Sequence, residues 1–154
     1  MKTKEIEIDF ENSIGPWIGS TIKVIDYYIH EEIKAEKLDL TKEQIKILKN
    51  LFFNDGINQN ELACLTLRNK SSLTRLLVKM EKKNYIIRKQ SKEDKRINNV
   101  FITPLGKEMF VQTRPMIKKT MDIMEKDISK KEKQIMISLL KKIQTNFGLT
   151  IESL

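Results

Sequence analysis

The amino-acid sequence predicts a mainly α-helical protein with one small β-hairpin. Apolar residues recur at spacings of three and four through most of the chain, which is the period of a helix that buries one face. Only the short segments 85–88 and 100–102 replace this period with β-branched and aromatic runs. The 154 residues include only 5 Gly and 3 Pro and are 40% apolar, so we expect one globular domain with a substantial core.

The first predicted helix runs from Ser13 to about Lys37. Ser13 is a possible cap, and Pro16 lies near the first turn, where proline is tolerated because its missing N–H would be unpaired anyway. One face of this helix is a stripe of isoleucines at helical spacing: Ile18, Ile22, Ile25, Ile29 and Ile33. A long amphipathic helix is therefore expected here.

Three shorter helices are predicted to follow. Thr41 and Gln44 have the spacing of a capping box, and their helix should end at the helix-breaking pair Asp55 and Gly56. Asn58, followed three residues later by Glu61, marks the expected start of a short third helix that runs through Leu65. The fourth, capped by Asn69, buries a stripe formed by Leu73, Leu76, Leu77 and Met80.

Beyond Lys83 the segments 85–88 and 100–102 predict a two-stranded hairpin with a charged tip over 89–99. Thr103 and Pro104 then open a fifth helix, which Pro115 should kink or divide. Ser129 and Glu132 form a second capping box, and the last helix should end near Gly148.

The net charge of the chain is concentrated in one stretch. Of its 29 Lys and Arg and 21 Asp and Glu, 11 bases and 3 acids lie between Arg68 and Arg96, so the other 125 residues carry 18 of each and are neutral. A solvated Lys-rich face is the ordinary explanation of such a run. A neutral protein with a single basic face is also typical of nucleic-acid binding, and the structural elements decide between the two.

The order of elements favours nucleic-acid binding. A short helix, a turn, a second helix that begins with small polar and basic residues, and a charged hairpin make a winged helix-turn-helix, whose second helix enters the major groove of DNA. Arg75 can donate two hydrogen bonds to the edge of a guanine, whereas lysines such as Lys79 are suited to contacts with phosphates. The candidate DNA-binding residues of the recognition helix are Lys70, Ser71, Ser72, Thr74, Arg75 and Lys79.

The hairpin supplies a second group of candidate DNA-binding residues. A basic tip can enter the minor groove, where the negative potential attracts Arg. Asp94 interrupts the bases and is expected to pair with a neighbouring Arg or to order the turn. The candidates of the wing are Arg88, Lys92, Asp94, Lys95 and Arg96.

The segments 61–63, 69–75, 81–88, 94–96 and 100–106 together resemble the helix-turn-helix and wing of the multiple-antibiotic-resistance regulator (MarR) family. The resemblance implies a homodimeric bacterial transcription regulator whose wing Arg, here Arg96, reaches the minor groove. Asn84 stands where the family usually has Gly, and Asn also tolerates the left-handed conformation of a helix end. The first helix contains no Cys, unlike that of the oxidant-sensing members.

The same resemblance implies dimerisation helices over 13–37 and 104–148 on either side of a DNA-binding lobe over 41–103. The first and last helices also carry more apolar surface than a compact lobe can cover, which favours burial by a partner. The candidate interface residues are Ile18, Ile22, Ile117, Met121, Ile135, Leu139 and Ile143.

A small aromatic or phenolic effector is a possible further partner. Its candidate pocket is formed by Trp17, Tyr27, Tyr28, His30 and Phe52, although aromatic residues at helical spacing more often pack in a core. Neither the single cysteine, Cys64, nor the single histidine matches a metal site, and no cofactor is expected.

Together these features predict a regulator that binds double-stranded DNA sequence-specifically, most simply a ligand-responsive repressor on a pseudo-palindromic operator. The alternative is a winged-helix module that binds RNA or protein without operator specificity. No phosphate-binding Gly loop or catalytic constellation points to an enzyme. With no apolar run of membrane-spanning length and no leader-like N-terminus, a cytoplasmic protein without a membrane partner is expected.

Overall fold

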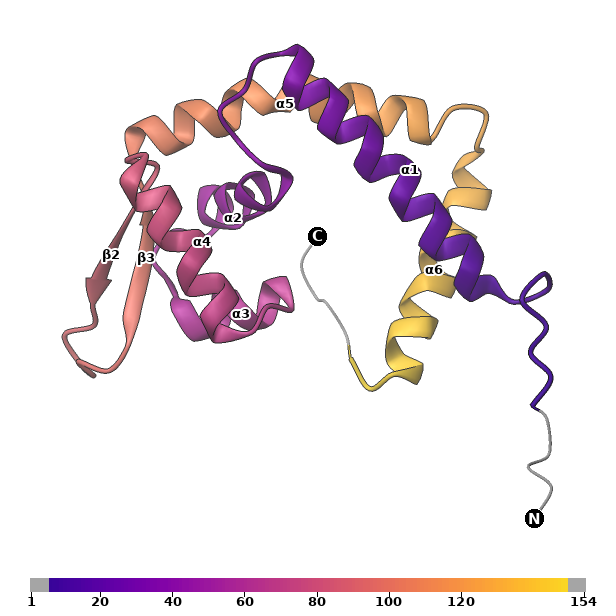
Figure 1. Ribbon diagram of the computed structural model, residues 1–154, viewed down its shortest axis with the longest axis horizontal. Helices are drawn as coiled ribbons and strands as arrows, with labels where there is room; N and C mark the ends of the chain where they lie inside the picture. The colour runs from indigo at the N-terminus through magenta and orange to yellow at the C-terminus, as the bar shows by residue number, and fades with distance from the viewer. Residues whose placement is uncertain (1–5, 150–154) are drawn as a thin grey trace. The chain divides into compact units, whose positions relative to one another are not determined.

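A computed structural model describes residues 6–149 of the chain. The chain divides into two compact units between Asp39 and Leu40. The first unit contains one helix, and the second contains five helices and a small sheet (Figure 1). The mainly helical fold with a small β wing is therefore confirmed.

The first unit is built on α1 (Ile14–Ala35). Ser13 occupies the N-cap position with extended backbone, but its side chain makes no capping hydrogen bond, so that part of the prediction is wrong. The helix ends two residues before the predicted Lys37, which itself takes a left-handed conformation with φ of 51°. Much of the apolar surface of α1 is exposed, including Ile22 at 51%.

The second unit begins with α2 (Lys42–Phe53), α3 (Gln59–Thr66) and α4 (Lys70–Lys82). The Thr41–Gln44 capping box is present, with the Gln44 N–H donating to Thr41 Oγ1 at 3.2 Å and the Thr41 N–H donating to Gln44 Oε1 at 3.1 Å. At the start of α4 the Asn69 carbonyl oxygen Oδ1 accepts from the Ser72 N–H at 2.8 Å. These predicted helix starts are confirmed because each depends only on residues within one turn.

The sheet has three antiparallel strands rather than the two predicted. β2 (Ile86–Gln90) and β3 (Asn98–Ile102) form the hairpin, and β1 (Ile57–Asn58) pairs with the other edge of β3. Ile57 lies opposite Val100, and Ile86 lies opposite Ile102. The central strand is thus held on both sides, and only the tip beyond Gln90 and Asn98 projects from the sheet.

The chain then continues into α5 (Pro104–Met124) and α6 (Lys130–Asn146). Pro115 does not divide α5, which stays one helix, although the carbonyl of Val111 has no N–H to accept from at that position. Thr113 and Met116 are buried on either side of Pro115, so packing supports the helix on both sides of the proline. The predicted capping box of Ser129 and Glu132 is present at the start of α6.

The core of the second unit lies between the helix-turn-helix, the sheet and α5. Its fully buried side chains come from every one of these elements, and each aliphatic one stabilises the fold by roughly 1.5–3 kcal/mol. They include Leu48, Leu51, Leu62, Leu73, Leu77, Met80 and Val100. Because α4 contributes three of these residues, its buried face is fixed and its opposite face is turned outward.

Candidate nucleic-acid interface

The recognition helix α4 presents a polar face opposite its buried stripe. Leu73, Leu77 and Met80 are completely buried. Of the predicted DNA-binding residues, Lys70, Ser71, Arg75 and Lys79 are exposed, whereas Ser72 and Thr74 are half-buried. The structure therefore places all six on the helix that the sequence indicated, and four of them are exposed.

The C-terminal end of α4 has the conformation expected from Asn84. This residue is left-handed, with φ of 57°. Its N–H donates to the Glu81 carbonyl at 2.8 Å, and the Tyr85 N–H donates to the Met80 carbonyl at 3.0 Å. This pair of bonds is the Schellman motif, which is usually closed by Gly. The substitution of Asn for Gly in the motif leaves the helix end intact.

The turn between α3 and α4 also contains a left-handed residue, but a less suitable one. Leu67 has φ of 49° and is 59% exposed. Its N–H donates to the Cys64 carbonyl at 3.1 Å, and the Arg68 N–H donates to the Ala63 carbonyl at 3.0 Å. A β-carbon in this conformation costs roughly 1–2 kcal/mol, so the turn of the helix-turn-helix is strained.

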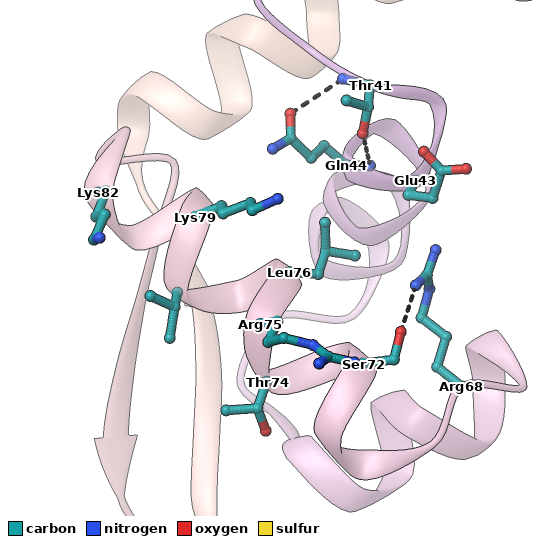
Figure 2. Close-up of a pocket in the computed structure, with 11 residues that line it drawn as sticks. Thr41, Glu43, Gln44, Arg68, Ser72, Thr74, Arg75, Leu76, Lys79 and Lys82 are labelled. Atoms are coloured by element: carbon teal, nitrogen blue, oxygen red, sulfur yellow. Dashed lines mark hydrogen bonds between the residues drawn. The ribbon is translucent and has the colours of Figure 1, made fainter.

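A groove of about 580 Å³ runs between the start of α2 and the outer face of α4 (Figure 2). Lys79 extends from α4 toward α2, and Arg68 reaches from the turn toward Ser72. The groove attracts anions because its basic side chains outnumber its single acid, Glu43. Its lining residues are Thr41, Glu43, Gln44, Arg68, Ser72, Thr74, Arg75, Leu76, Val78, Lys79 and Lys82.

The first strand of the wing is attached to the recognition helix by an ion pair. Arg88 Nη2 lies 2.6 Å from Glu81 Oε2, and the Arg88 N–H donates to Glu81 Oε1 at 3.0 Å. The hydrogen bond from the Arg88 side chain is the main cause of the lowered pKa of Glu81. The Arg88 side chain is only 21% exposed, unlike the other bases predicted for the wing.

The tip of the wing is ordered by Asp94, as predicted. Asp94 Oδ1 accepts from the Arg96 N–H at 2.9 Å and lies 3.3 Å from Arg96 Nε. The Arg96 side chain is nevertheless 92% exposed. Lys92 and Lys95 are exposed beside it. Asp94 thus shapes the turn, and Arg96 extends from it into solvent.

The residues predicted for an effector pocket lie on two elements. Trp17 and Tyr27 are 67% and 71% exposed on α1, where His30 is also exposed and Tyr28 is half-buried. Phe52 belongs to α2, and its ring centroid lies 5.0 Å from that of Phe110 on α5. A pocket formed by these five residues stays a prediction.

The residues predicted for dimerisation are largely accessible in the single chain. Ile22 on α1, Met121 on α5, and Ile135 and Leu139 on α6 are 49–55% exposed, and Ile18, Ile117 and Ile143 are half-buried. No residue of α6 within the described part of the chain is buried.

Two kinds of feature are absent from residues 6–149. No group of His, Cys, Asp and Glu that could hold a metal ion occurs among them. None of their helices is long and apolar enough to cross a membrane.

Sequence reasoning did not single out two polar residues that contact α4. Arg68 Nη1 donates to Ser72 Oγ at 3.0 Å, and Gln59 Nε2 donates to Thr74 Oγ1 at 2.9 Å. Arg68 opens the basic stretch, which was the available signal for it. No sequence pattern pointed to Gln59, because its contact with Thr74 joins residues 15 positions apart.

Comparisons with known proteins agree with this geometry. Residues 40–97 match the model of the MarR family. The transcriptional regulator SarZ of Staphylococcus haemolyticus is 31% identical over 132 residues, which cover 84% of this chain and 83% of SarZ. A MarR protein of Peptoclostridium difficile has a solved structure with a TM-score of 0.80 and 26% identity, covering 95% of both chains.

A DNA-bound structure has the same fold. A mutant MarR from E. coli, complexed with operator DNA, matches with a TM-score of 0.79 and 24% identity over 88% of this chain and 99% of that one. The winged helix-turn-helix architecture described above is therefore shared with a protein crystallised on its operator.

Proposed function

This chain belongs to the MarR family of transcriptional regulators, and on that premise we propose that it is a homodimer that binds a pseudo-palindromic DNA operator sequence-specifically. In the simplest form of the proposal it is a repressor that leaves the operator when a small aromatic or phenolic effector binds. It acts in the cytoplasm and needs no cofactor or catalytic group.

The observation that carries the proposal is the exposed polar face of α4. Arg75 is exposed on this face and can donate two hydrogen bonds to guanine, a contact worth roughly 1–3 kcal/mol of discrimination. Lys70 and Lys79 suit phosphates, which set affinity and register. The face is held in place because Leu73 and Leu77 are buried behind it.

The proposed wing contacts are those at the tip. Arg96, whose side chain is 92% exposed, would enter the minor groove, with Lys92 and Lys95 on the phosphates. Arg88 receives a different role in the proposal, because its guanidinium is bound to Glu81. We assign it to holding the wing against α4.

The proposed dimer interface is formed by α1, α5 and α6. The exposed apolar residues of α6 in the single chain, such as Leu139, support this assignment. Two-fold symmetry would place the two recognition helices in major grooves about one helical turn, roughly 10 bp, apart. A bound effector would act by changing that separation.

Selection of bound duplexes from a random DNA pool tests the proposal. The expected result is an inverted repeat with half-sites about 10 bp apart. Arg75→Ala should relax the preference at one base pair of each half-site, since only that contact is removed. Equal loss of binding to specific and random DNA would contradict the role of Arg75. Preference for double-stranded RNA over DNA in direct competition would favour an RNA-binding module instead.

A further inference from the structure

The side-chain hydroxyls of Thr74 and Ser72 on the recognition helix differ in the hydrogen bonds that they make. Thr74 Oγ1 donates to the Lys70 carbonyl at 2.8 Å and accepts from Gln59 Nε2 at 2.9 Å. Ser72 Oγ accepts from Arg68 Nη1 at 3.0 Å and, among the hydrogen bonds of the described residues, donates none. The Thr74 hydroxyl is therefore already used as donor and acceptor, whereas the Ser72 proton is available to a ligand.

The hydrogen bond from Arg68 favours Ser72 as a donor toward a ligand. A hydroxyl has one proton and two lone pairs, and one lone pair of Ser72 is occupied by the guanidinium. Accepting a hydrogen bond from a cation polarises the O–H bond and makes the same oxygen a better donor. Figure 2 shows the Arg68 side chain extending from the turn to reach Ser72 in the first turn of α4.

We infer that Arg68 is a positioning residue that sets Ser72 as a hydrogen-bond donor, so that Ser72 reads an acceptor on a base edge in the major groove. The inference rests on the proposed function, since it assumes that α4 enters that groove. Purines offer N7, guanine also offers O6, and thymine offers O4, whereas cytosine presents only its amino donor there. Cytosine should therefore be disfavoured where a base faces Ser72.

The test is selection from a random duplex pool with the full chain and its variants. Wild-type protein should disfavour cytosine at one position of each half-site by roughly threefold to tenfold, the value of one hydrogen bond. Ser72→Ala and Arg68→Ala should both remove this preference at the same position. The double variant should show no further change at that position, because the two single substitutions abolish the same contact with the base. Arg68→Lys, which keeps a charged donor, should retain the preference.

Lys82→Ala is the matched control, because Lys82 lines the same groove and carries the same charge as Arg68. It should weaken binding to all sequences alike and reduce the salt dependence by about one charge.

Three results would overturn the inference, and they are distinguishable. If Arg68→Ala behaves like Lys82→Ala and leaves the preference of Ser72 intact, Arg68 is only a phosphate contact. A wild-type preference for cytosine at the position that Ser72→Ala relaxes would show that Ser72 acts as an acceptor. If wild-type protein selects no sequence at all, the proposed function fails, and the inference fails with it.

Discussion

The hydroxyl of Thr103 donates a hydrogen bond of 2.6 Å to the main-chain carbonyl of Asn84, 19 residues away. The same oxygen accepts from the Gly106 N–H at 3.0 Å, and the Thr103 N–H donates to the Tyr85 carbonyl at 3.0 Å. The first turn of α5 is thus built on the residues that end the recognition helix. A displacement of that turn would strain the end of α4 directly.

Gly106 is required for this contact. A β-carbon at position 106 would lie 2.1 Å from the Tyr85 carbonyl oxygen, which is backbone and has little freedom to move. We expect Gly106→Ala to lower the free energy of unfolding by about 3 kcal/mol, measured by urea denaturation at constant protein concentration. Gly19→Ala is the control, because its added carbon would have no neighbour within 4 Å in the part of the chain that the structure describes. Equal effects of the two substitutions would rule out a steric cause.

Glu81→Gln should loosen the wing. The substitution removes the charge that Arg88 binds, and Arg88 Nε is already buried with no hydrogen-bond partner among residues 6–149. The expected loss in free energy of unfolding is about 1–2 kcal/mol. Glu93→Gln, in the exposed loop of the wing, should change it by less than about 0.5 kcal/mol.

The contribution of Glu81 should also depend on pH. Arg88 lowers the pKa of Glu81 from its ordinary value of 4.5, so the stabilisation is fully present above that value and is lost as the pH falls through the lowered pKa. The difference between wild type and Glu81→Gln should therefore shrink as denaturation is repeated from about pH 6 to about pH 3. A difference that grows on acidification would contradict the ion pair.

Leu67→Gly should stabilise the protein. Leu67 is left-handed and exposed, so removing its β-carbon relieves strain at little loss of packing. Relief of roughly 1–2 kcal/mol is partly offset by the flexibility of Gly in the unfolded chain, leaving a gain of about 0.5–1 kcal/mol in thermal or urea unfolding. Leu67→Ala keeps the β-carbon and should give no such gain. If Leu67→Ala raised the stability as much as Leu67→Gly, backbone strain at this position would not be the cause of the gain.

Arg96→Ala should weaken binding most on operators with a narrow, A·T-rich minor groove beside the half-site. Such grooves concentrate negative potential, and the Arg96 side chain at the wing tip is 92% exposed. On these operators the loss should be about 1 kcal/mol or more, roughly fivefold to tenfold in Kd, measured by fluorescence anisotropy. Lys95→Ala should affect A·T-rich and G·C-rich flanks alike. Unchanged affinity of Arg96→Ala on both would remove the wing from the proposed interface.

Leu139→Asp should produce monomers that bind the operator poorly, because it places a charge in the proposed dimer interface. Leu139 is 55% exposed in the single chain, so the substitution spares the core. Analytical ultracentrifugation measures the effect. Lys141→Asp, two residues along on the opposite side of α6, should remain dimeric. A stable Leu139→Asp dimer would locate the interface elsewhere.

Most helix starts could be predicted from the sequence because their determinants are local. Each of the two capping boxes, at the starts of α2 and α6, forms within one turn. The end of α4 is equally local, because the Asn84 N–H donates to the Glu81 carbonyl and the next N–H donates to the Met80 carbonyl. Ser13 shows the limit of this reasoning. It has the right residue type at the right place, but its side chain makes no capping bond.

The remaining features depend on contacts between residues far apart in the sequence. β1 has two residues, too few to show any period, and it exists only because β3 pairs with it. Pro115 lies inside α5 because burial of Thr113 and Met116 outweighs one lost backbone bond. The pairing of Arg88 with Glu81, like that of Arg68 with Ser72, follows from how α4 meets its neighbours, which charge counting did not reveal.

The pairing of Ile57 with Val100 has a consequence for the order of folding. It closes a long loop that contains both α3 and α4, so the entropy of closing that loop must be overcome before the sheet can form. During synthesis, the recognition helix leaves the ribosome before the strand that completes its support. The polar face of α4 is therefore expected to take its final position only after residues 98–102 have emerged.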